Sequence, residues 1–237
     1  FCVKSAGLGI YGVVTYNGAP AAGLSLDLLL CDSNGCSVKS TTTTGADGSY
    51  NFTGVQGLMA GKEYVVRYLN LPDRPNPGSG YLRLWAAKRI TTYPVGSAVA
   101  GGDFDVADVA LVSPADGATV TLPAEFCWTP RSITSDNYDW VIYYPTRDEL
   151  GHTGYLGNVS CETITGLLPN WPSGATYQWW VEVYQGDNPD ATPYNLGMSY
   201  ERRQAVIRYS ASSDNLQDSL LHRAVPGWKK PPFQGLQ

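Results

Sequence analysis

The sequence predicts an all-β chain of two tandem antiparallel β-sandwich domains, followed by an extended C-terminal arm. Three observations lead to this prediction. The chain has 237 residues, which is room for two domains of ordinary size. Only 16% of the residues are charged, while Gly (26), Pro (16) and Tyr (16) are plentiful, as in short strands joined by tight turns. Short alternating apolar runs, each closed by a turn signal, follow one another from residue 10 onward.

The first domain is expected to span residues 1–110. In the stretch "TTTTGADGSYNFTG" (41–54), Asp47-Gly48 supplies a tight hairpin turn, after which Tyr50 and Phe52 point to the core. The segment 70–80 holds three prolines and is expected to cross between sheets. The expected strands are 10–16, 24–30, 37–44, 50–53, 63–69, 81–90 and 103–112.

Three stretches of this domain carry a resemblance: "YGVVTYNGAPAAGLSLDL", "TTTTGADGSYNFTGV" and "GKEYVVRY". They resemble the prealbumin-like repeats of carboxypeptidase regulatory domains and of the B-type stalk domains of bacterial surface adhesins. The resemblance covers residues 8–70 clearly and up to 110 loosely. It implies a fold that serves as spacer, stalk or ligand binder, and therefore no single function.

The second domain is expected to span residues 111–209. "LVSPADGATVTLPAEFCWTP", "DNYDWVIYY", "TYQWWVEVY" and "RRQAVIRY" resemble bacterial fibronectin type III domains, so that both domains would be immunoglobulin-like sandwiches. The resemblance implies that Cys127 and Cys161 lie on neighbouring strands of one sheet. It also implies an inward-facing core, made of Phe126, Trp128, Tyr138, Trp140, Tyr177, Trp179 and Val181.

Cysteine spacing predicts disulfide bonds. Cys31 and Cys36 flank a hairpin loop, so they face each other across two strands. Zinc is the competing interpretation, but a structural zinc site needs four ligands, and the only histidines are His152 and His222. We therefore expect a Cys31–Cys36 disulfide and a second bridge from Cys127 to Cys161.

Cys2 is left without a partner by these two pairs. An odd cysteine in a secreted protein is a liability, so we expect it to bond to another molecule or chain segment. A free, buried or artefactual thiol is the alternative.

Charge and hydropathy exclude other classes. The net charge is −5, without the broad basic footprint that a nucleic-acid partner needs. No apolar run approaches the about 20 residues of a membrane span, and no signal-peptide core precedes Phe1, so the numbering is expected to start at a processed or trimmed end. No cofactor is expected, because no phosphate-binding or nucleophile motif occurs.

Two groups of residues invite a chemical interpretation. Asp103, Asp105 and Asp108 could form a weak calcium site, but a solvated strand face explains them better. His152 and His222 are expected on loops and lie in no metal or catalytic motif. We therefore expect no enzyme, although catalytic groups can be assembled in space.

Exposed aromatic residues are the stronger signal. If Trp179 faces the core, alternation sends Trp180 and Tyr184 outward, beside Tyr143 of the neighbouring strand. Such an apolar stripe predicts an interaction surface or a sugar-binding platform. The alternative is that the first domain folds back over this face.

Two Asn-x-Ser/Thr tripeptides, at Asn51 and Asn158, are glycosylation candidates. The tripeptide is common by chance, so this interpretation stays open at both positions.

The arm, residues 210–237, opens with a polar stretch and ends in a basic one. The last sixteen residues contain three of the 16 basic residues and no acid, which leaves 13 basic against all 21 acidic residues on the rest of the chain. We expect the arm to dock on a neighbouring copy; its docking on its own domains is nearly as well supported. Its expected contact residues are Arg223, Trp228, Lys229, Lys230, Phe233 and Leu236.

Taken together, these features predict a non-catalytic extracellular structural or adhesive protein. Its expected partners are further copies of itself, in a cell-surface fibre, and cell-surface glycans. A carbohydrate-binding accessory module of a secreted enzyme is the alternative function.

Overall fold

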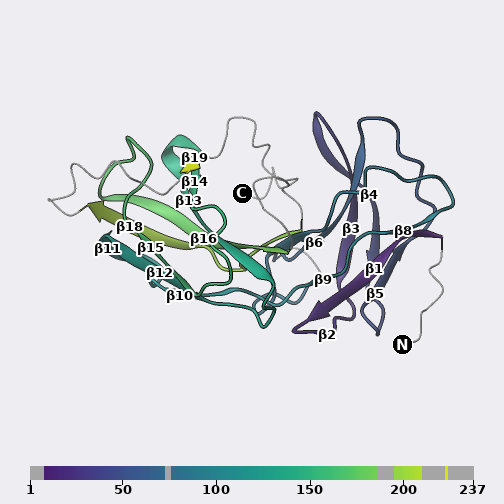
Figure 1. Cartoon of the computed structure of the whole chain (residues 1–237), viewed down its shortest axis with the longest axis horizontal. Coiled ribbons are helices and arrows are strands. Elements are labelled where there is room, and N and C mark those ends of the chain that lie inside the picture. The colour runs from purple at the N-terminus through teal and green to yellow at the C-terminus, as the bar shows by residue number, and fades with distance from the viewer. Residues whose placement is uncertain (1–7, 73–75, 186–194, 210–221, 224–237) are drawn as a thin grey trace. The chain divides into compact units, whose positions relative to one another are not determined.

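The computed structural model describes residues 8–72, 76–185, 195–209 and 222–223 (Figure 1). Apart from one short 3-10 helix, η1 (Pro145–Arg147), every regular element described is a β-strand. The described residues fall into two compact units. The first comprises 8–107 with 195–197, and the second comprises 108–185 with 198–209 and 222–223. The chain is all-β, as its composition predicts.

One sheet of the first unit is built around β1 (Gly9–Tyr16). The strands β2 (Ala19–Pro20) and β5 (Ser49–Phe52) pair with it antiparallel. The strands β8 (Ala98–Ala100) and β9 (Phe104–Asp105) pair with it parallel. The prediction of a purely antiparallel sandwich is therefore wrong for these two short strands.

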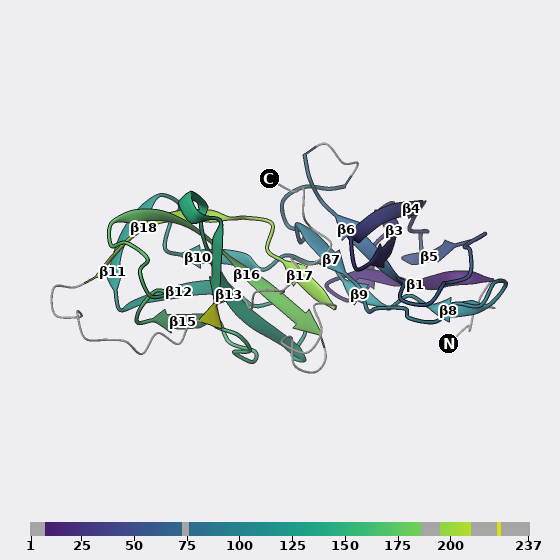
Figure 2. The same cartoon turned by 90° about the horizontal axis from the view of Figure 1, so that it is seen from above.

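The other sheet of the first unit has the order β7-β6-β3-β4. Its strands are β3 (Ser25–Asp32), β4 (Gly35–Thr43), β6 (Glu63–Leu69) and β7 (Leu84–Ala86). Figure 2 shows β3, β4 and β6 lying on one side of β1. All seven residues of β6 are buried, so both faces of this central strand are covered.

Aromatic side chains join the two sheets of the first unit. The rings of Trp85 and Phe104 are stacked with centroids 5.8 Å apart. Within the sheet built on β1, the Tyr50 hydroxyl donates a hydrogen bond to the Gly102 carbonyl at 2.7 Å. Gly12 allows this close approach, because a Cβ at its position would lie 2.5 Å from the same carbonyl oxygen.

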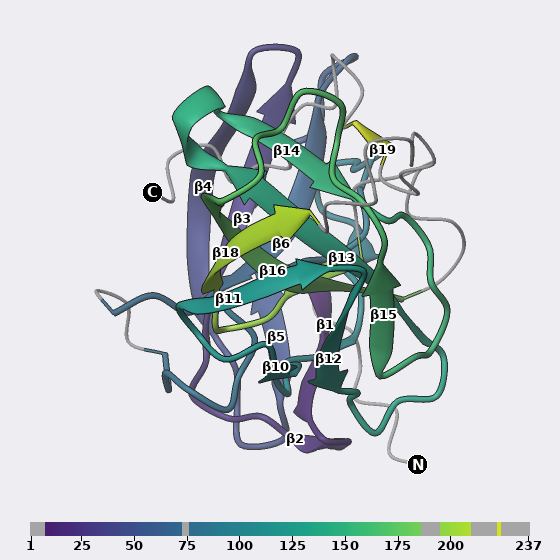
Figure 3. The ribbon, with the colours of Figure 1, turned by 90° about the vertical axis from the view of Figure 1, so that its left-hand side faces the viewer.

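The second unit also has two sheets (Figure 3). The smaller has the order β10-β12-β15, and the larger is built on β13 and β16, which pair antiparallel over eight residues. The strands β14 and β18 flank this central pair, β19 pairs with β14, and β11 runs parallel to β18. The bounds are β10 (Ala110–Ser113), β11 (Ala118–Leu122), β12 (Ala124–Thr129), β13 (Asp136–Tyr144), β14 (Glu149–His152), β15 (Cys161–Ile164), β16 (Ala175–Gln185), β18 (Arg203–Tyr209) and β19 (His222–Arg223). A further short strand is β17 (Leu196–Met198).

The core of the second unit is the aromatic set that the sequence predicts. The Phe126 ring lies 4.8 Å from Trp140 and 5.1 Å from Trp179 between ring centroids. Trp128 lies 5.9 Å from Tyr138. Each of these side chains is at most 2% exposed, so burial of aromatic surface stabilises this unit.

Two expected strands differ from the structure. In 81–90, only Leu84–Ala86 forms a strand, with isolated bridges at Tyr81 and Ile90. The run 103–112 is divided into β9, in the first unit, and β10, in the second, because the chain leaves one sheet at Asp105 and joins another at Ala110. Alternating apolar residues continue across this point, so their pattern hides the break.

No helix within the described residues has the length and apolar character needed to cross a bilayer.

Phe126→Ala tests the aromatic core. Phe126 is fully buried between Trp140 and Trp179, so its truncation leaves a cavity and should cost about 3 to 5 kcal/mol of the unfolding free energy of the second unit. Guanidinium unfolding followed by tryptophan fluorescence measures this loss. Val112→Ala, at a side chain that is 56% exposed, is the control and should change stability by less than about 0.5 kcal/mol. Equal losses of unfolding free energy in Phe126→Ala and Val112→Ala would contradict the assignment of Phe126 to the aromatic core.

Candidate functional site

Both expected cysteine pairs are disulfides in the structure. Cys31 and Cys36 lie directly opposite each other on β3 and β4, with a Cα–Cα distance of 4.0 Å. Cys127 and Cys161 lie opposite each other on β12 and β15, also at 4.0 Å. Each bridge therefore joins adjacent strands of one sheet, within one unit.

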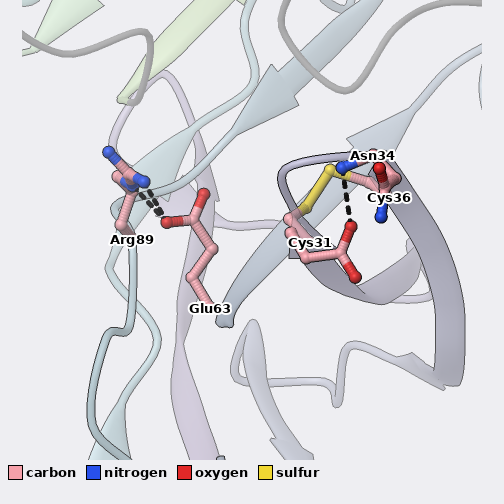
Figure 4. Close-up of a disulfide and its surroundings, with 6 residues drawn as sticks. Cys31, Asn34, Cys36, Glu63 and Arg89 are labelled. Atoms are coloured by element: carbon pink, nitrogen blue, oxygen red, sulfur yellow. Dashed lines mark hydrogen bonds and ion pairs between the residues drawn. A yellow bond between two sulfur atoms is a disulfide. The ribbon is translucent and has the colours of Figure 1, made fainter. Parts of the chain in front are cut away.

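The Cys31–Cys36 bridge lies beside two further restraints (Figure 4). At the turn, the Asn34 amide donates a hydrogen bond to the Asp32 carboxylate at 2.8 Å. On β6, Glu63 lies opposite Cys31 and forms an ion pair with Arg89. The disulfide and the Asp32–Asn34 hydrogen bond thus hold the end of this hairpin, and the Glu63–Arg89 ion pair ties the neighbouring strand β6 to the segment after β7.

The aromatic stripe that the sequence predicts is not exposed. Trp180 is 4% exposed and Tyr184 is 3% exposed; Tyr143 is half-buried and donates a hydrogen bond to the Asp148 carboxylate at 2.8 Å. The prediction of an open stripe is wrong, because alternation identifies the face of a strand but does not show whether that face is covered. The Arg202 guanidinium lies over the Trp180 ring, 4.7 Å from its centroid.

Two carboxylates lie among these aromatic residues. The register of β13 and β16 places Asp139 directly opposite Glu182. The Glu182 carboxylate accepts hydrogen bonds from the Trp180 indole at 3.1 Å and from the Tyr184 hydroxyl at 2.8 Å. The face expected to be an apolar stripe is therefore a buried polar cluster.

His152 completes this cluster from β14. Its Nδ1 lies 3.0 Å from the Asp139 carboxylate, which also accepts hydrogen bonds from the amides of Thr153 and Gly154, at 3.1 and 2.9 Å. A carboxylate at Nδ1 fixes the orientation of an imidazole ring. The expectation that His152 lies on a loop is wrong, because the Gly-rich segment around it forms a strand.

The cluster residues Asp139, His152 and Glu182 are all nearly closed to solvent, at 2%, 6% and 4% exposure. Burial and the nearby Asp139 charge raise the pKa of Glu182 to about 7, although the hydrogen bonds from Tyr184 and Trp180 oppose the shift. Burial also raises the pKa of Asp139, although the hydrogen bond from His152 opposes this. The Glu182 carboxylate can therefore gain or lose a proton near neutral pH. The cluster also joins the neighbouring strands β13, β14 and β16.

Sequence reasoning missed Asp139 and Glu182. A signal was present: alternation places both carboxylates on the same sheet face as Trp180, Tyr184 and Tyr143, inside long strands and away from turns.

In the first unit, Asp27 and Arg67 form an ion pair. They lie opposite each other on β3 and β6, with 2.6 Å between Nη2 and Oδ2.

The aspartates considered for calcium have separate roles. The exposed Asp103 accepts a hydrogen bond from the Val13 amide at 2.8 Å. Asp105 is 3% exposed and accepts bonds from Thr15, Gly18 and Ala107, at 2.8 to 2.9 Å. The expectation of a solvated strand face is wrong for Asp105. Its side chain is buried, and its hydrogen bond from Thr15 links β9 to β1.

Asp108 belongs to the second unit and is half-buried, and burial raises its pKa to about 6. Across the part of the chain that the structure describes, no group of three or more His, Cys, Asp or Glu residues is placed to hold a metal ion.

The two glycosylation candidates differ in their surroundings. Asn158 is exposed, but its amide donates hydrogen bonds to the carbonyls of Ile133 and Asp136, at 3.2 and 3.1 Å. Asn51 is half-buried, and its Oδ1 is closed to solvent. A sugar at either position stays a prediction.

Most residues expected in the arm lie outside the described part of the chain: Trp228, Lys229, Lys230, Phe233 and Leu236, and also Cys2 near the N-terminus. The backbones of His222 and Arg223 are described, as β19. His222, which was expected on a loop, is thus in a strand.

Removal of the disulfide that closes the longer loop should cost more stability, because the loop entropy grows with the logarithm of loop length. The unfolded chain gains more freedom when Cys127→Ala/Cys161→Ala opens a 34-residue separation than when Cys31→Ala/Cys36→Ala opens one of 5. The expected losses are about 4 and about 2 kcal/mol. Hydrogen exchange, read from peptides of each unit, measures both in the intact chain. If either double variant destabilised both units equally, the assignment of each bridge to a single unit would be contradicted.

Glu182 should make the second unit more stable in mild acid. Its pKa is about 7 when folded and 4.5 ordinarily, so the cost of its buried charge disappears as the pH falls through 7 and is fully removed below 4.5. Between about pH 8 and about pH 5, the unfolding free energy should rise by roughly 2 to 3 kcal/mol from this group.

Glu182→Gln should remove this rise and be more stable than the wild type at about pH 8. Glu125→Gln, at an exposed position on β12, is the matched control and should keep the wild-type profile. Denaturant unfolding at a series of pH values gives both profiles, and an unchanged slope in Glu182→Gln would refute the role of this carboxylate.

No protein-family model and no curated protein matches the chain. Among solved structures, it is similar to a DUF3823 family protein from Bacteroides uniformis, at 12% identity over 84% of this chain and 97% of that one, with a TM-score of 0.23. It is also similar to BcpA, the major pilin subunit of Bacillus cereus, at 13% identity over 85% and 69%, with a TM-score of 0.29. The TIE protein of Bacillus anthracis matches at 9% identity over 85% and 33%, with a TM-score of 0.27.

Proposed function

We propose that the chain is an extracellular structural or adhesive protein that forms a repeating subunit of a cell-surface fibre. The observation that carries this proposal is the pair of disulfides, one in each unit, each across adjacent strands. Disulfides form and persist in oxidising compartments, outside the cytosol. They suit a protein that must stay folded outside the cell.

The division of the chain into two units supports a role as a structural spacer that presents a surface to other molecules. Each has its own pair of sheets and its own aromatic core, built around Trp85 and Phe104 in the first unit and around Phe126 and Trp140 in the second. We propose that the division between them corresponds to the domain boundary expected near residue 110. Sandwiches of this type serve many functions, so the fold alone does not decide.

The sugar-binding alternative loses its main support from the burial of Trp180 and Tyr184. A platform for a sugar ring needs an open aromatic face, whereas these side chains are closed and bonded to Glu182. The buried Asp139 and His152 favour a role in positioning strands over a role in substrate chemistry.

We propose that the C-terminal segment connects one subunit to the next. The segment after residue 221 carries Arg223, Lys229 and Lys230 without an acid, while the rest of the chain is acidic. Within one chain, the backbone of β19 pairs with β14 of its own unit, as in the alternative of docking on its own domains, and this pairing is consistent with a segment that can add to a sheet edge. An extended segment that pairs with an edge strand is a general mode of association.

Deletion of residues 224–237 tests the proposal. The full chain should form oligomers or filaments, seen by native mass spectrometry and negative-stain imaging, and the truncated chain should be monomeric. Trp228→Ala/Phe233→Ala/Leu236→Ala, which keeps the charge of the segment, is the companion variant and should weaken assembly. Assembly of the truncated chain at the wild-type level would show that this segment is not the connector.

A further inference from the structure

Three large apolar side chains are exposed at one end of the first unit. Leu8 is 65% exposed, Met59 is 64% exposed and Val95 is 75% exposed. They come from three separate segments: the residue before β1, the connection from β5 to β6, and the turn before β8. Exposed apolar residues that are scattered singly need no explanation, whereas a group of them at one end of a domain indicates a contact surface.

Hydrogen bonds hold these three segments together. The Gly9 amide donates to the Ser97 carbonyl at 2.8 Å, and β8 runs parallel to the beginning of β1 (Figure 2). The Leu58 amide donates to the Tyr93 carbonyl at 3.1 Å, which joins the connection before β6 to the segment before β8. The exposed side chains therefore belong to one surface, the apolar tip, defined by Leu8, Met59 and Val95.

Two tight turns place Met59 and Val95 at the outside of the apolar tip. Val95 is the second residue of a turn that is closed by a hydrogen bond from the Ser97 amide to the Pro94 carbonyl, at 3.2 Å. Met59 begins a second turn, closed by a hydrogen bond from the Lys62 amide to the Met59 carbonyl, also at 3.2 Å. The third residue of each turn is a glycine with positive φ, as a type II turn requires. The turns thus present both side chains from a defined backbone.

The backbone of the apolar tip is suited to an apolar medium. The amides that close the two turns, and the amides of Gly9 and Leu58, all donate to carbonyls of the same end of the unit. A backbone group that enters an apolar medium without a partner costs free energy. These hydrogen bonds lower the cost of taking the apolar tip out of water.

The first unit is electrically polarised, and the apolar tip lies at its basic end. This end reaches from the tip to the ladder position of Leu28 opposite Val66, and comprises residues 8–12, 28–40, 50–66 and 87–101. Its charged residues are Lys39, Lys62, Lys88 and Arg89, against Asp32 and Glu63. The other described residues of the unit carry the opposite excess: Arg67 and Arg83, against Asp27, Asp47, Asp103 and Asp105.

Two exposed lysines give this end its net positive charge. Both acidic residues of the end are in ion pairs, one with Lys62 and one with Arg89. Lys39 and Lys88 are exposed, on β4 and on the segment after β7. Exposed apolar groups beside a positive charge are typical of protein surfaces that bind negatively charged lipid.

A lipid surface suits the apolar tip better than a protein partner does. A specific protein interface buries about 800 Å² on each partner, around a packed core. The apolar tip instead presents three side chains from two turns and from the start of a strand. Such side chains can enter the boundary of a bilayer individually, while lysines beside them contact lipid phosphates.

We propose that the apolar tip of the first unit binds the surface of a negatively charged lipid bilayer. Leu8, Met59 and Val95 enter the boundary between headgroups and acyl chains, and Lys39 and Lys88 remain among the phosphates. The contact is peripheral and does not use a membrane-spanning segment. The inference goes beyond the proposed function, because it assigns a contact to the first unit that does not require assembly of subunits.

Vesicle flotation tests this inference. The full chain should float with vesicles made of equal parts of phosphatidylcholine and phosphatidylglycerol, and much less with phosphatidylcholine alone. Met59→Ser/Val95→Ser should lower the affinity for the mixed vesicles about tenfold or more, because it removes apolar surface from the contact. Both positions are exposed, so thermal unfolding of this variant should match that of the wild type. Val112→Ser, at an exposed valine of the second unit, is the matched control and should bind as the wild type does.

Two further measurements separate the charge from the insertion. Lys39→Gln/Lys88→Gln should weaken binding and reduce its dependence on salt, because salt screens the attraction of lysines to phosphates. In a Cys2→Ser background, an environment-sensitive dye on Met59→Cys should be quenched by lipids with brominated acyl chains, whereas the same dye on Val112→Cys should not.

The inference would be overturned if the full chain failed to float with the mixed vesicles, or if Met59→Ser/Val95→Ser floated as well as the wild type. Native mass spectrometry without lipid adds a further outcome: if that variant lost self-association and kept its vesicle binding, the apolar tip would be a contact between proteins and not with lipid. Filaments of a wild-type chain that does not bind vesicles would refute this inference and leave the proposed function standing.

Discussion

The register of β13 against β16 is the constraint on which the second unit depends. Eight residues of each strand are paired, so alternation sends Tyr138, Trp140 and Trp179 to one face and Asp139 and Glu182 to the other. A slip of one residue would move the carboxylates into the aromatic core and the indoles out of it. Burial of the aromatic face against Phe126 makes such a slip costly, and the same register then brings the two carboxylates together.

Several buried carboxylates in this protein are paired with donors from neighbouring strands or from adjacent loops. Asp27 finds Arg67 across β3 and β6, and Asp136 forms a two-pronged pair with Arg131, at 2.7 and 2.9 Å. Asp105 has three donors from backbone and hydroxyl groups. Such pairs add little net stability, but removal of one partner leaves an uncompensated charge, so they specify one strand arrangement.

Local patterns predicted those features that depend on neighbours in the sequence. The turn at Asp47-Gly48 is present, and Tyr50 and Phe52 are buried as alternation requires. The hairpin predicted over residues 41–54 is wrong, however, because β4 pairs with β3 and β5 pairs with β1, so this stretch connects two sheets. The covered face at Trp180 was not predictable, because coverage depends on contacts between distant segments. β14 was missed because glycines hide a strand whose hydrogen bonds come from β13 and whose histidine is held by Asp139.

The Cys127–Cys161 bridge also sets how the chain responds to force. The bridge closes a loop with a sequence separation of 34, and both β13 and β14 lie inside it. A chain pulled apart from its two ends cannot extend this loop, so its contour length is shortened by about 110 Å. Under tension, the segment that contains β14 carries no load along its backbone, because the load passes through the sulfur atoms at its base.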